Sequence, residues 1–426
     1  MRNDLKPVEK LEVKDNKVKI RIVTVVIAFI IGITALIYGF TSLLGGESGY
    51  QKINVGDDNA YMANDLSFSY NIGVNPNRTN TELKDLINLY SDYVEYSYKL
   101  LDPYNEYENV NNVYYLNKHP NEVIKVEPLL YNSLKEISDK GMLYYTYLEP
   151  LYYQTTSIIL GKEEGLDDYS PLHNKDVRNY YDEIYRYIVN SSISLEIFDD
   201  YMVRLNVNNE YLNYINTNKI DYIFSFGYLK NSVMVDYIAS SLITKGFTYG
   251  IISSNDGYTR ILGDNDEFNY SILDYNKRSY IACRGSFKGE YAIVNLRNYN
   301  YYSNENERIF SYNDELYSYY INESGEYLNT RKSLIMYKNN GACLNVALNM
   351  LDLFFNDYNS DKISNLATNN IYTIYCNNFK INYNDNNLKL SNLETADGNK
   401  YVEELIWLKE IRSEERRVGK ECRSRW

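Results

Sequence analysis

The most constraining feature of the sequence is the run of residues 22–44, IVTVVIAFIIGITALIYGFTSLL, which contains no charged side chain. At a rise of ~1.5 Å per residue, a helix of this length crosses the ~30 Å hydrocarbon layer of a bilayer. A secretory signal peptide has a shorter apolar run, of about 7–15 residues, and a small-residue cleavage site, which is missing here. No polar face interrupts the run, which argues against a buried core helix. The sequence therefore predicts an uncleaved transmembrane signal anchor.

The charges on the two sides of this run predict its orientation. Lys14, Lys17, Lys19 and Arg21 precede it, whereas acidic residues dominate the side that follows it. Because basic residues are retained on the cytoplasmic side of a membrane, residues 1–21 are predicted to be a cytoplasmic tail. We therefore expect a single-pass protein of the cell membrane whose main domain is extracytoplasmic.

Composition divides the rest of the chain into three parts. Residues 45–66 are polar and rich in Gly, Asp and Asn, which predicts a linker between the membrane and the domain. Residues 67–411 are predicted to form the folded domain. Residues 412–426, RSEERRVGKECRSRW, are rich in Arg and lack the Tyr and Asn of the body. They predict a non-native read-through tail, and a basic interaction tail is the alternative.

Charge and residue counts exclude several classes of function. The formal net charge of −13 argues against nucleic acid as a partner, since binding the phosphate backbone needs a basic face. His119 and His173 are the only histidines, which excludes a histidine-rich zinc site. Without the tail, the cysteines are Cys283, Cys343 and Cys376, and their spacing predicts neither a disulfide framework nor a metal site.

The hydrophobic pattern alternates between helical and strand periods without a regular βαβ series, which predicts an α+β fold of mixed sheets with packed helices. The predicted helices cover residues 83–101, 126–137, 176–191, 232–245 and 343–355. The predicted strands cover residues 249–253, 259–262, 279–283, 291–296 and 331–337, followed by a closing hairpin at 371–392 with its tight turn at 384–386.

Six segments carry further information through their order. They are LLDPYNEYENVNNVYYLN (100–117), FGYLKNSVMVDYIASSLITKGF (226–247), GIISSNDGYTRILG (250–263), SNENERIF (303–310), YSYYINESGEYLN (317–329) and LNVALNML (344–351). In this order they resemble the successive motifs of the FAD:protein FMN transferases (ApbE-type flavin transferases), in the form common in low-GC Gram-positive bacteria. The resemblance extends over roughly residues 80–395.

This resemblance implies a function and a set of site residues. The family uses FAD and Mg²⁺, and it joins the FMN half of FAD to a threonine of a protein, here an extracytoplasmic flavoprotein acceptor. The catalytic His of the family aligns with Tyr319, or with Ser318 or Tyr320 if the gap moves. The positions that align with its flavin-binding motifs are Tyr104, Asn105, Lys230, Asn231, Asp236, Asn255, Asp256, Gly257 and Ser303.

The resemblance also shows which chemical groups have changed. Asn345 and Asn349 stand at the family's metal-binding Asp and Thr positions, four residues apart on one helix face. Mg²⁺ is usually held by one or two carboxylates, so two neutral amides predict weak or absent metal binding. The family's Lys-Gly pair aligns with Asn231 and Ser232, and its Gly-Gly turn with Asn255 and Asp256. Together with the missing His, these changes predict weakened or lost transferase activity.

Three functions remain open at this point. The first is a divergent enzyme that still transfers FMN to a secreted flavoprotein. The second is a non-catalytic module that binds a flavin or a partner at the cell surface. The third is an adhesion or carbohydrate-contact domain, which requires exposed tyrosines that form a contiguous patch.

Overall fold

A nine-stranded sheet forms the centre of the protein. The computed structural model describes residues 49–74, 81–161, 171, 173–263, 267–276, 278–300, 309–312, 315–356, 358–393, 398 and 400–406. The strands follow the spatial order β1 (Gly49–Ile53), β2 (Leu66–Ile72), β6 (Gly250–Ser254), β7 (Tyr258–Ile261), β10 (Tyr291–Arg297), β13 (Ser333–Asn339), β14 (Tyr372–Asn377), β15 (Lys380–Tyr383) and β17 (Val402–Leu405). Neighbouring strands are antiparallel, except that β15 and β17 are parallel.

The central strands bury both of their faces, because successive side chains of a strand point to opposite sides. In β10, Val294 belongs to the larger hydrophobic core and its neighbour Ile293 to the smaller one. In β13, Met336 belongs to the larger core and Ile335 to the smaller one. The sheet therefore separates two cores, and this explains why its central strands read as nearly continuous apolar runs.

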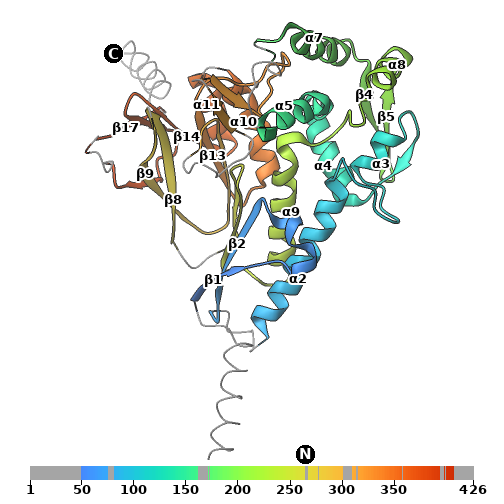
Figure 1. Ribbon diagram of the computed structural model, residues 1–426. Coiled ribbons are helices and arrows are strands. Elements are labelled where there is room, and N and C mark those ends of the chain that lie inside the picture. Colours follow the sequence, from blue (N-terminus) through green and yellow to red (C-terminus); the bar gives the residue numbers. More distant parts are fainter. Residues whose placement is uncertain are drawn as a thin grey trace, which may run out of the picture.

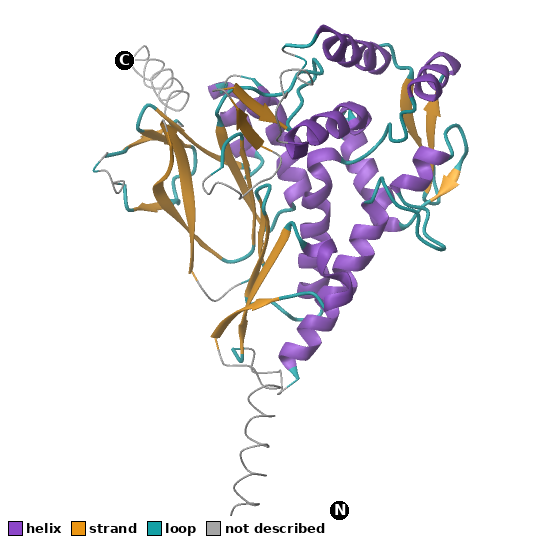
Figure 2. Ribbon diagram, in the orientation of Figure 1, coloured by secondary structure: helices purple, strands orange, loops and turns teal. Residues whose placement is uncertain are grey.

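The larger core lies between the sheet and three helices. These helices are α2 (Glu82–Leu101), α9 (Lys230–Thr244) and α10 (Cys343–Phe355). α9 contacts both of the others, and α10 packs on β10 and β13. Figures 1 and 2 show the helices gathered on this side of the sheet.

The smaller core lies on the opposite face of the sheet, under a second sheet of three strands. This sheet has the order β16 (Lys389–Ser391), β9 (Arg278–Lys288) and β8 (Glu267–Asn276). Cys283 and Phe287 of β9 pack there against Ile335 and Tyr337 of β13. The two layers form a sandwich on the side away from the helices, as Figure 1 shows.

The remaining elements pack around the helical side or at its edges. They are η2 (Asp57–Ala63), α3 (Val113–Lys118), β3 (Ile124–Lys125), α4 (Pro128–Asp139), η3 (Leu143–Tyr147), α5 (Glu149–Gly161), α7 (Lys175–Val189), β4 (Ile193–Ile197), β5 (Met202–Val207), α8 (Asn209–Asn218), η4 (Gly227–Leu229), β11 (Ile309–Tyr312), β12 (Glu315–Ser318) and α11 (Ser360–Thr368). Asparagine side chains cap α3, α7, α8 and α11 by accepting backbone N–H groups of the first turn. The abundant asparagine of this chain therefore defines where several helices begin.

Two predictions about the chain's organisation are wrong. A linker is predicted over residues 45–66, but residues 49–66 contain β1 and η2, and β1 pairs with β2 at the edge of the sheet. The closing hairpin turns at Asn378 and Phe379, both with positive φ, rather than at residues 384–386. The later turn leads instead into β16, which pairs with β9 in the second sheet.

The predicted anchor at residues 22–44, the cytoplasmic tail and the terminal segment 412–426 lie outside the described residues. Within the part of the chain that the structure describes, no helix has the length and apolar character needed to cross a membrane. The helices and strands confirm the predicted mixed α+β class.

Candidate functional site

A small cavity lies where α5, the loop after α2 and the start of α9 meet. Its volume is about 180 Å³. It is lined by Leu101, Pro103, Tyr104, Glu149, Thr156, Ser225, Phe226, Gly227, Lys230 and Tyr319. Three residues that the resemblance predicts for the site, Tyr104, Lys230 and Tyr319, therefore meet at one cavity although they are far apart in the sequence.

Glu149 is the buried carboxylate of this cavity. It is the first residue of α5 and is only 1% exposed. One of its oxygens accepts a hydrogen bond from the Tyr104 hydroxyl at 2.7 Å, and the other accepts one from the Ser225 hydroxyl. Burial raises the pKa of Glu149 to about 7, while the two hydroxyls and the nearby Lys230 oppose that rise. A carboxyl with such a pKa exchanges protons near neutral pH.

Lys230 and Tyr319 complete the walls of the cavity. The Lys230 ammonium lies over the Tyr98 ring, 4.0 Å from its centre. The ring of Tyr319 lies 5.0 Å from the ring of Tyr152. Tyr319 is the residue that the resemblance aligns with a catalytic His, with Ser318 and Tyr320 as alternatives, and near neutral pH a phenol is a poorer proton acceptor than imidazole. The structure therefore presents Tyr319 as part of an aromatic wall.

A tight backbone turn fixes the floor of the cavity. Gly227 has a φ of +52°, a conformation that side-chain-bearing residues rarely adopt. A Cβ atom at this position would lie 2.4 Å from the Tyr152 ring. Glycine therefore allows the Tyr152 ring to pack against the backbone of a residue that lines the cavity.

The loop that carries Tyr104 is organised by Asp102. The Asp102 carboxylate accepts hydrogen bonds from the Tyr104 N–H, the Asn105 amide and the Tyr107 hydroxyl. Asn112 also holds the loop, by donating to the Asn105 carbonyl oxygen at 2.9 Å. Asn105, predicted to bind flavin, thus acts here within the loop, and it is absent from the cavity lining.

The predicted flavin-binding residues Asn231, Asn255 and Asp256 form a separate polar cluster. The Asn231 amide donates to Asp256 at 3.0 Å and to Asp65 at 3.3 Å. The Asn255 amide donates to Asp65 at 2.8 Å. Gly257, also predicted for the site, lies against β10, because a Cβ there would be 2.0 Å from the Asn295 carbonyl oxygen. These side chains tie α9 and the β6–β7 turn to the residue that precedes β2.

Asp236, another predicted flavin-binding residue, connects three elements of the fold. Its carboxylate accepts the backbone N–H groups of Cys343 and Leu344, at 2.7 and 2.9 Å, at the start of α10. It also accepts a hydrogen bond from Arg260 of β7 at 3.0 Å. Burial raises the pKa of Asp236, against the opposing effect of Arg260 and the two amides. These contacts fix α10 on α9 and the sheet.

The predicted metal-binding residues on α10 face α4 and do not line the cavity. The Asn345 amide donates to Glu136 of α4 at 3.1 Å. The Lys140 ammonium, at the end of α4, donates to the side-chain oxygen of Asn349 at 3.2 Å. Asn349 in turn donates to the Asn345 carbonyl oxygen at 2.7 Å.

This donor set does not suit Mg²⁺. Asn345 and Asn349 offer neutral amides, and a lysine ammonium already uses the Asn349 oxygen that would be needed as a ligand. Among the described residues, no group of three or more His, Cys, Asp or Glu side chains is arranged to hold a metal ion.

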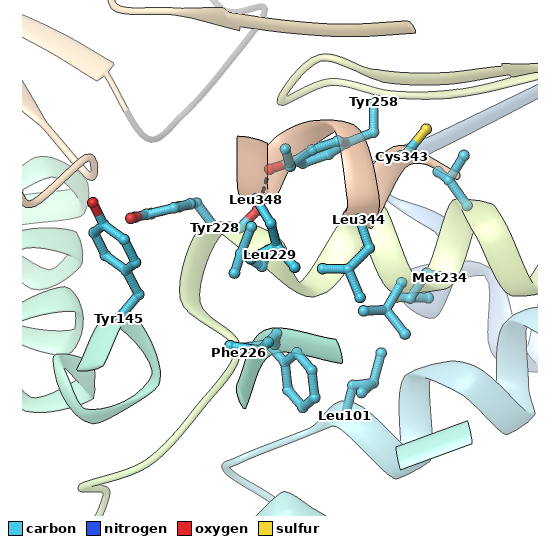
Figure 3. Close-up of a cluster of buried hydrophobic side chains, with 14 of the residues drawn as sticks. Leu101, Tyr145, Phe226, Tyr228, Leu229, Met234, Tyr258, Cys343, Leu344 and Leu348 are labelled. Atoms are coloured by element: carbon cyan, nitrogen blue, oxygen red, sulfur yellow. Dashed lines mark hydrogen bonds between the residues drawn. The ribbon is translucent and has the colours of Figure 1, made fainter. Parts of the chain in front are cut away.

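An apolar cluster fills the space between α10 and the start of α9. Figure 3 shows Leu344 and Leu348 of α10 facing Phe226, Leu229 and Met234, with all of these side chains buried. The cavity beside this cluster is also smaller than the ~300–1,000 Å³ typical of small-molecule pockets. A ligand of the size of FAD therefore does not fit the cavity as it stands.

Sequence reasoning missed Glu149, the central group of the cavity. An acidic residue at a helix start is common because it interacts favourably with the helix dipole, and this ordinary explanation hides its role. The available signal was its position as a lone carboxylate in the otherwise uncharged stretch 141–161. Ser303, which the resemblance predicts, lies outside the described residues.

Comparison with solved structures identifies the class of fold. The protein has an ApbE-type flavin-transferase fold. It is similar to the ApbE protein of Thermotoga maritima, with a TM-score of 0.50 and 11% identity over 77% of this chain and 94% of that one. It is also similar to the flavin transferase ApbE of Vibrio cholerae, with a TM-score of 0.51 and 14% identity over 81% of this chain and 96% of that one. No protein-family model and no curated protein sequence matches the chain. At these identities the likeness establishes the fold alone.

Proposed function

We propose that this protein is a membrane-anchored, extracytoplasmic protein of the flavin-transferase fold that has lost metal-dependent FMN transfer and acts as a binding module. One observation carries the proposal. At the α10 positions where the family places its metal ligands, Asn345 is bonded to Glu136 and Asn349 to Lys140. A pyrophosphate-cleaving site needs its phosphate charges neutralised, and an uncharged amide pair provides no strong cation site for that purpose.

The contacts of the other predicted residues support the same proposal. Asn231, Asn255, Asp256 and Asp236 make hydrogen bonds within the fold. The cavity beside them keeps a buried carboxyl, hydroxyls and aromatic rings. Such a cavity can recognise a small ligand without performing group transfer.

The test of lost transfer measures AMP release from FAD. The full-length protein in detergent micelles is incubated with FAD, Mg²⁺ and a threonine-containing flavoprotein acceptor, and AMP is quantified by chromatography. We expect no magnesium-dependent AMP, while the flavin transferase ApbE of Vibrio cholerae, used as the positive control, releases it. Magnesium-dependent AMP that disappears in Asn349→Ala would establish the divergent enzyme instead.

Two further measurements address the binding role and the anchor. Calorimetric titration with riboflavin, FMN and FAD tests whether a flavin is the ligand, and flat titrations with all three would remove flavin binding from the proposal.

Membrane fractionation of the full chain, compared with a variant that lacks residues 22–44, tests the anchor. We expect only the full chain in the membrane fraction, and equal distribution of both would contradict anchoring by this segment.

A further inference from the structure

Three tyrosines contact one another, and one of them, Tyr104, lines the cavity. The ring centres of Tyr104 and Tyr222 are 4.9 Å apart, those of Tyr153 and Tyr222 are 5.7 Å apart, and those of Tyr104 and Tyr153 are 6.2 Å apart. Tyr104 is 42% exposed and Tyr153 is 50% exposed. We call these three residues the tyrosine patch. Through Tyr104 the patch adjoins the cavity.

The cavity has spare hydrogen-bonding capacity next to apolar surface. Each oxygen of Glu149 accepts one hydrogen bond from a side chain, although a carboxylate oxygen has two lone pairs. The Thr156 hydroxyl also lines the cavity, and so do the rings of Phe226 and Tyr319. This combination suits a ligand that presents hydroxyl groups along its edges and C–H groups on its faces.

The charges around the patch disfavour strongly charged ligands. Glu106 and Glu108 are exposed in the loop that carries Tyr104, and they would repel a polyanion. The Lys118 ammonium lies 5.7 Å from the centre of the Tyr222 ring and is paired with Asp221 at 2.9 Å, and Lys230 lines the cavity, so charges of both signs surround the patch and a polycation meets no uniformly acidic surface. The volume of about 180 Å³ leaves room for a small ring but little more.

From these observations we propose that the cavity and the tyrosine patch together bind a neutral saccharide chain. Its terminal sugar ring enters the cavity, where its hydroxyls pair with Glu149 and Ser225. The following sugars lie with their C–H faces on Tyr104, Tyr153 and Tyr222. A peptide segment lacks the dense row of hydroxyls that these groups can satisfy. This inference rests on the proposed binding role of the cavity and is independent of whether FAD is cleaved.

The test is calorimetric titration of the full-length protein in detergent micelles with maltohexaose, cellohexaose and chitohexaose. We expect saturable binding of at least one of them. Tyr153→Ala removes one stacking surface and weakens that binding by about 2- to 13-fold. Above the pKa of Glu149, where the carboxyl is ionised, Glu149→Gln replaces a charged acceptor and weakens binding by about 10- to 150-fold. The control Tyr50→Ala changes a tyrosine of similar exposure, 47%, on β1 at the other end of the molecule, and it leaves the affinity unchanged (Figure 1).

The proposal is overturned if none of the three hexasaccharides binds. It is also overturned if Tyr153→Ala binds as tightly as the unaltered protein, or if Tyr50→Ala loses as much affinity as Tyr153→Ala. Saturable binding of oligolysine or heparin in place of the sugars would assign the patch to a charged partner. A failure in this titration leaves the AMP measurement unaffected, so the two proposals are tested separately.

Discussion

Two buried carboxylates in this fold show how differently the same chemical group is used. Asp236 receives two backbone N–H groups of α10 and the guanidinium of Arg260, which itself contacts Glu290 at 2.5 Å. Among the described residues, the side-chain donors to Glu149 are the hydroxyls of Tyr104 and Ser225, and Glu149 lines a cavity. Both pKa values are raised by burial.

The two carboxylates differ in the groups that donate hydrogen bonds to them. Backbone amides and a buried guanidinium cannot leave Asp236 without displacing a helix or a strand, so that carboxylate fixes the architecture. Side-chain hydroxyls can rotate toward a ligand, and the spare lone pairs of Glu149 remain available. The resemblance at the level of sequence motifs selects Asp236, whereas the geometry selects Glu149 as the functional candidate.

The largest effect is expected when the Asp236 ion pair is broken. Arg260→Met leaves Asp236 largely buried without its cation and should lower the free energy of unfolding by about 3–5 kcal/mol. Urea unfolding followed by circular dichroism measures it. Arg178→Met is the control, because that arginine is 39% exposed and pairs with Asp182 at the surface. It should cost about 1 kcal/mol or less. Equal losses in the two variants would contradict a structural role for the ion pair.

The next effect concerns the pH dependence of stability at Glu149. Its pKa is raised from 4.5 to about 7 in the fold, so folding favours the protonated form. The contribution of the protonated Glu149 to the stability of the fold is complete below pH 4.5 and is lost as the pH rises through 7. Relative to Glu149→Gln, the free energy of unfolding of the unaltered protein should fall by on the order of 3 kcal/mol as the pH rises over that interval. Urea midpoints measured across the interval give the difference.

The matched control for this titration is Glu196→Gln. The pKa of Glu196 is lowered by its hydrogen bond to Arg204, so its contribution is lost only as the pH falls. A pH profile of the protein that is the same with and without Glu149 would show that this carboxyl titrates normally, which would contradict its burial in the cavity.

A smaller effect is expected from the hydroxyl that holds Glu149. Tyr104→Phe removes one hydrogen-bond donor and should lower the free energy of unfolding by about 1 kcal/mol. It should also move the stability transition to higher pH, because that hydrogen bond favours the ionised carboxylate. Tyr201→Phe, at 41% exposure, is the control for the same chemical change elsewhere. If both variants behave alike in thermal and pH titrations, Tyr104 does not position the carboxylate.

The smallest effect is expected at Asn345 and Asn349, the α10 residues that the resemblance aligns with metal ligands. Adding Mg²⁺ to the unaltered protein should change the melting temperature by less than about 1 °C, since a ligand stabilises only in proportion to its occupancy of the fold. The variant with both Asn345→Asp and Asn349→Asp is the comparison, and it should gain a concentration-dependent rise. A clear rise in the unaltered protein that is lost in Asn349→Ala would show that the amides do bind the ion.

The sequence predicts the long-range features of the fold well where a pattern extends over many residues. The apolar residues of α2, α9 and α10 recur at helical spacing, and this periodicity predicts the residues that each helix buries. The edge strand β1, with sequence GYQKI, shows only a short alternation among polar residues, so composition suggested a linker there.

The site is less predictable, because it depends on which partners the fold brings together. Tyr104, Lys230 and Tyr319 lie at one cavity although they are far apart in the sequence. Asn231 and Asp256 form a hydrogen bond with each other, and the two residues come close only after folding. Glu149 belongs to none of the recognised motifs. It becomes a candidate because the fold buries it beside Ser225, which is 76 positions away in the sequence.

The position of β1 has a consequence for how the domain stands on a cell. The sheet begins at Gly49, so if residues 22–44 span the bilayer, only residues 45–48 separate the span from the sheet. Four residues reach at most about 14 Å. The β1 end would then be held close to the lipid headgroups, and α5, which lies at the opposite end in Figure 1, would point outward. A short tether of this kind would hold the α5 side of the domain away from the bilayer.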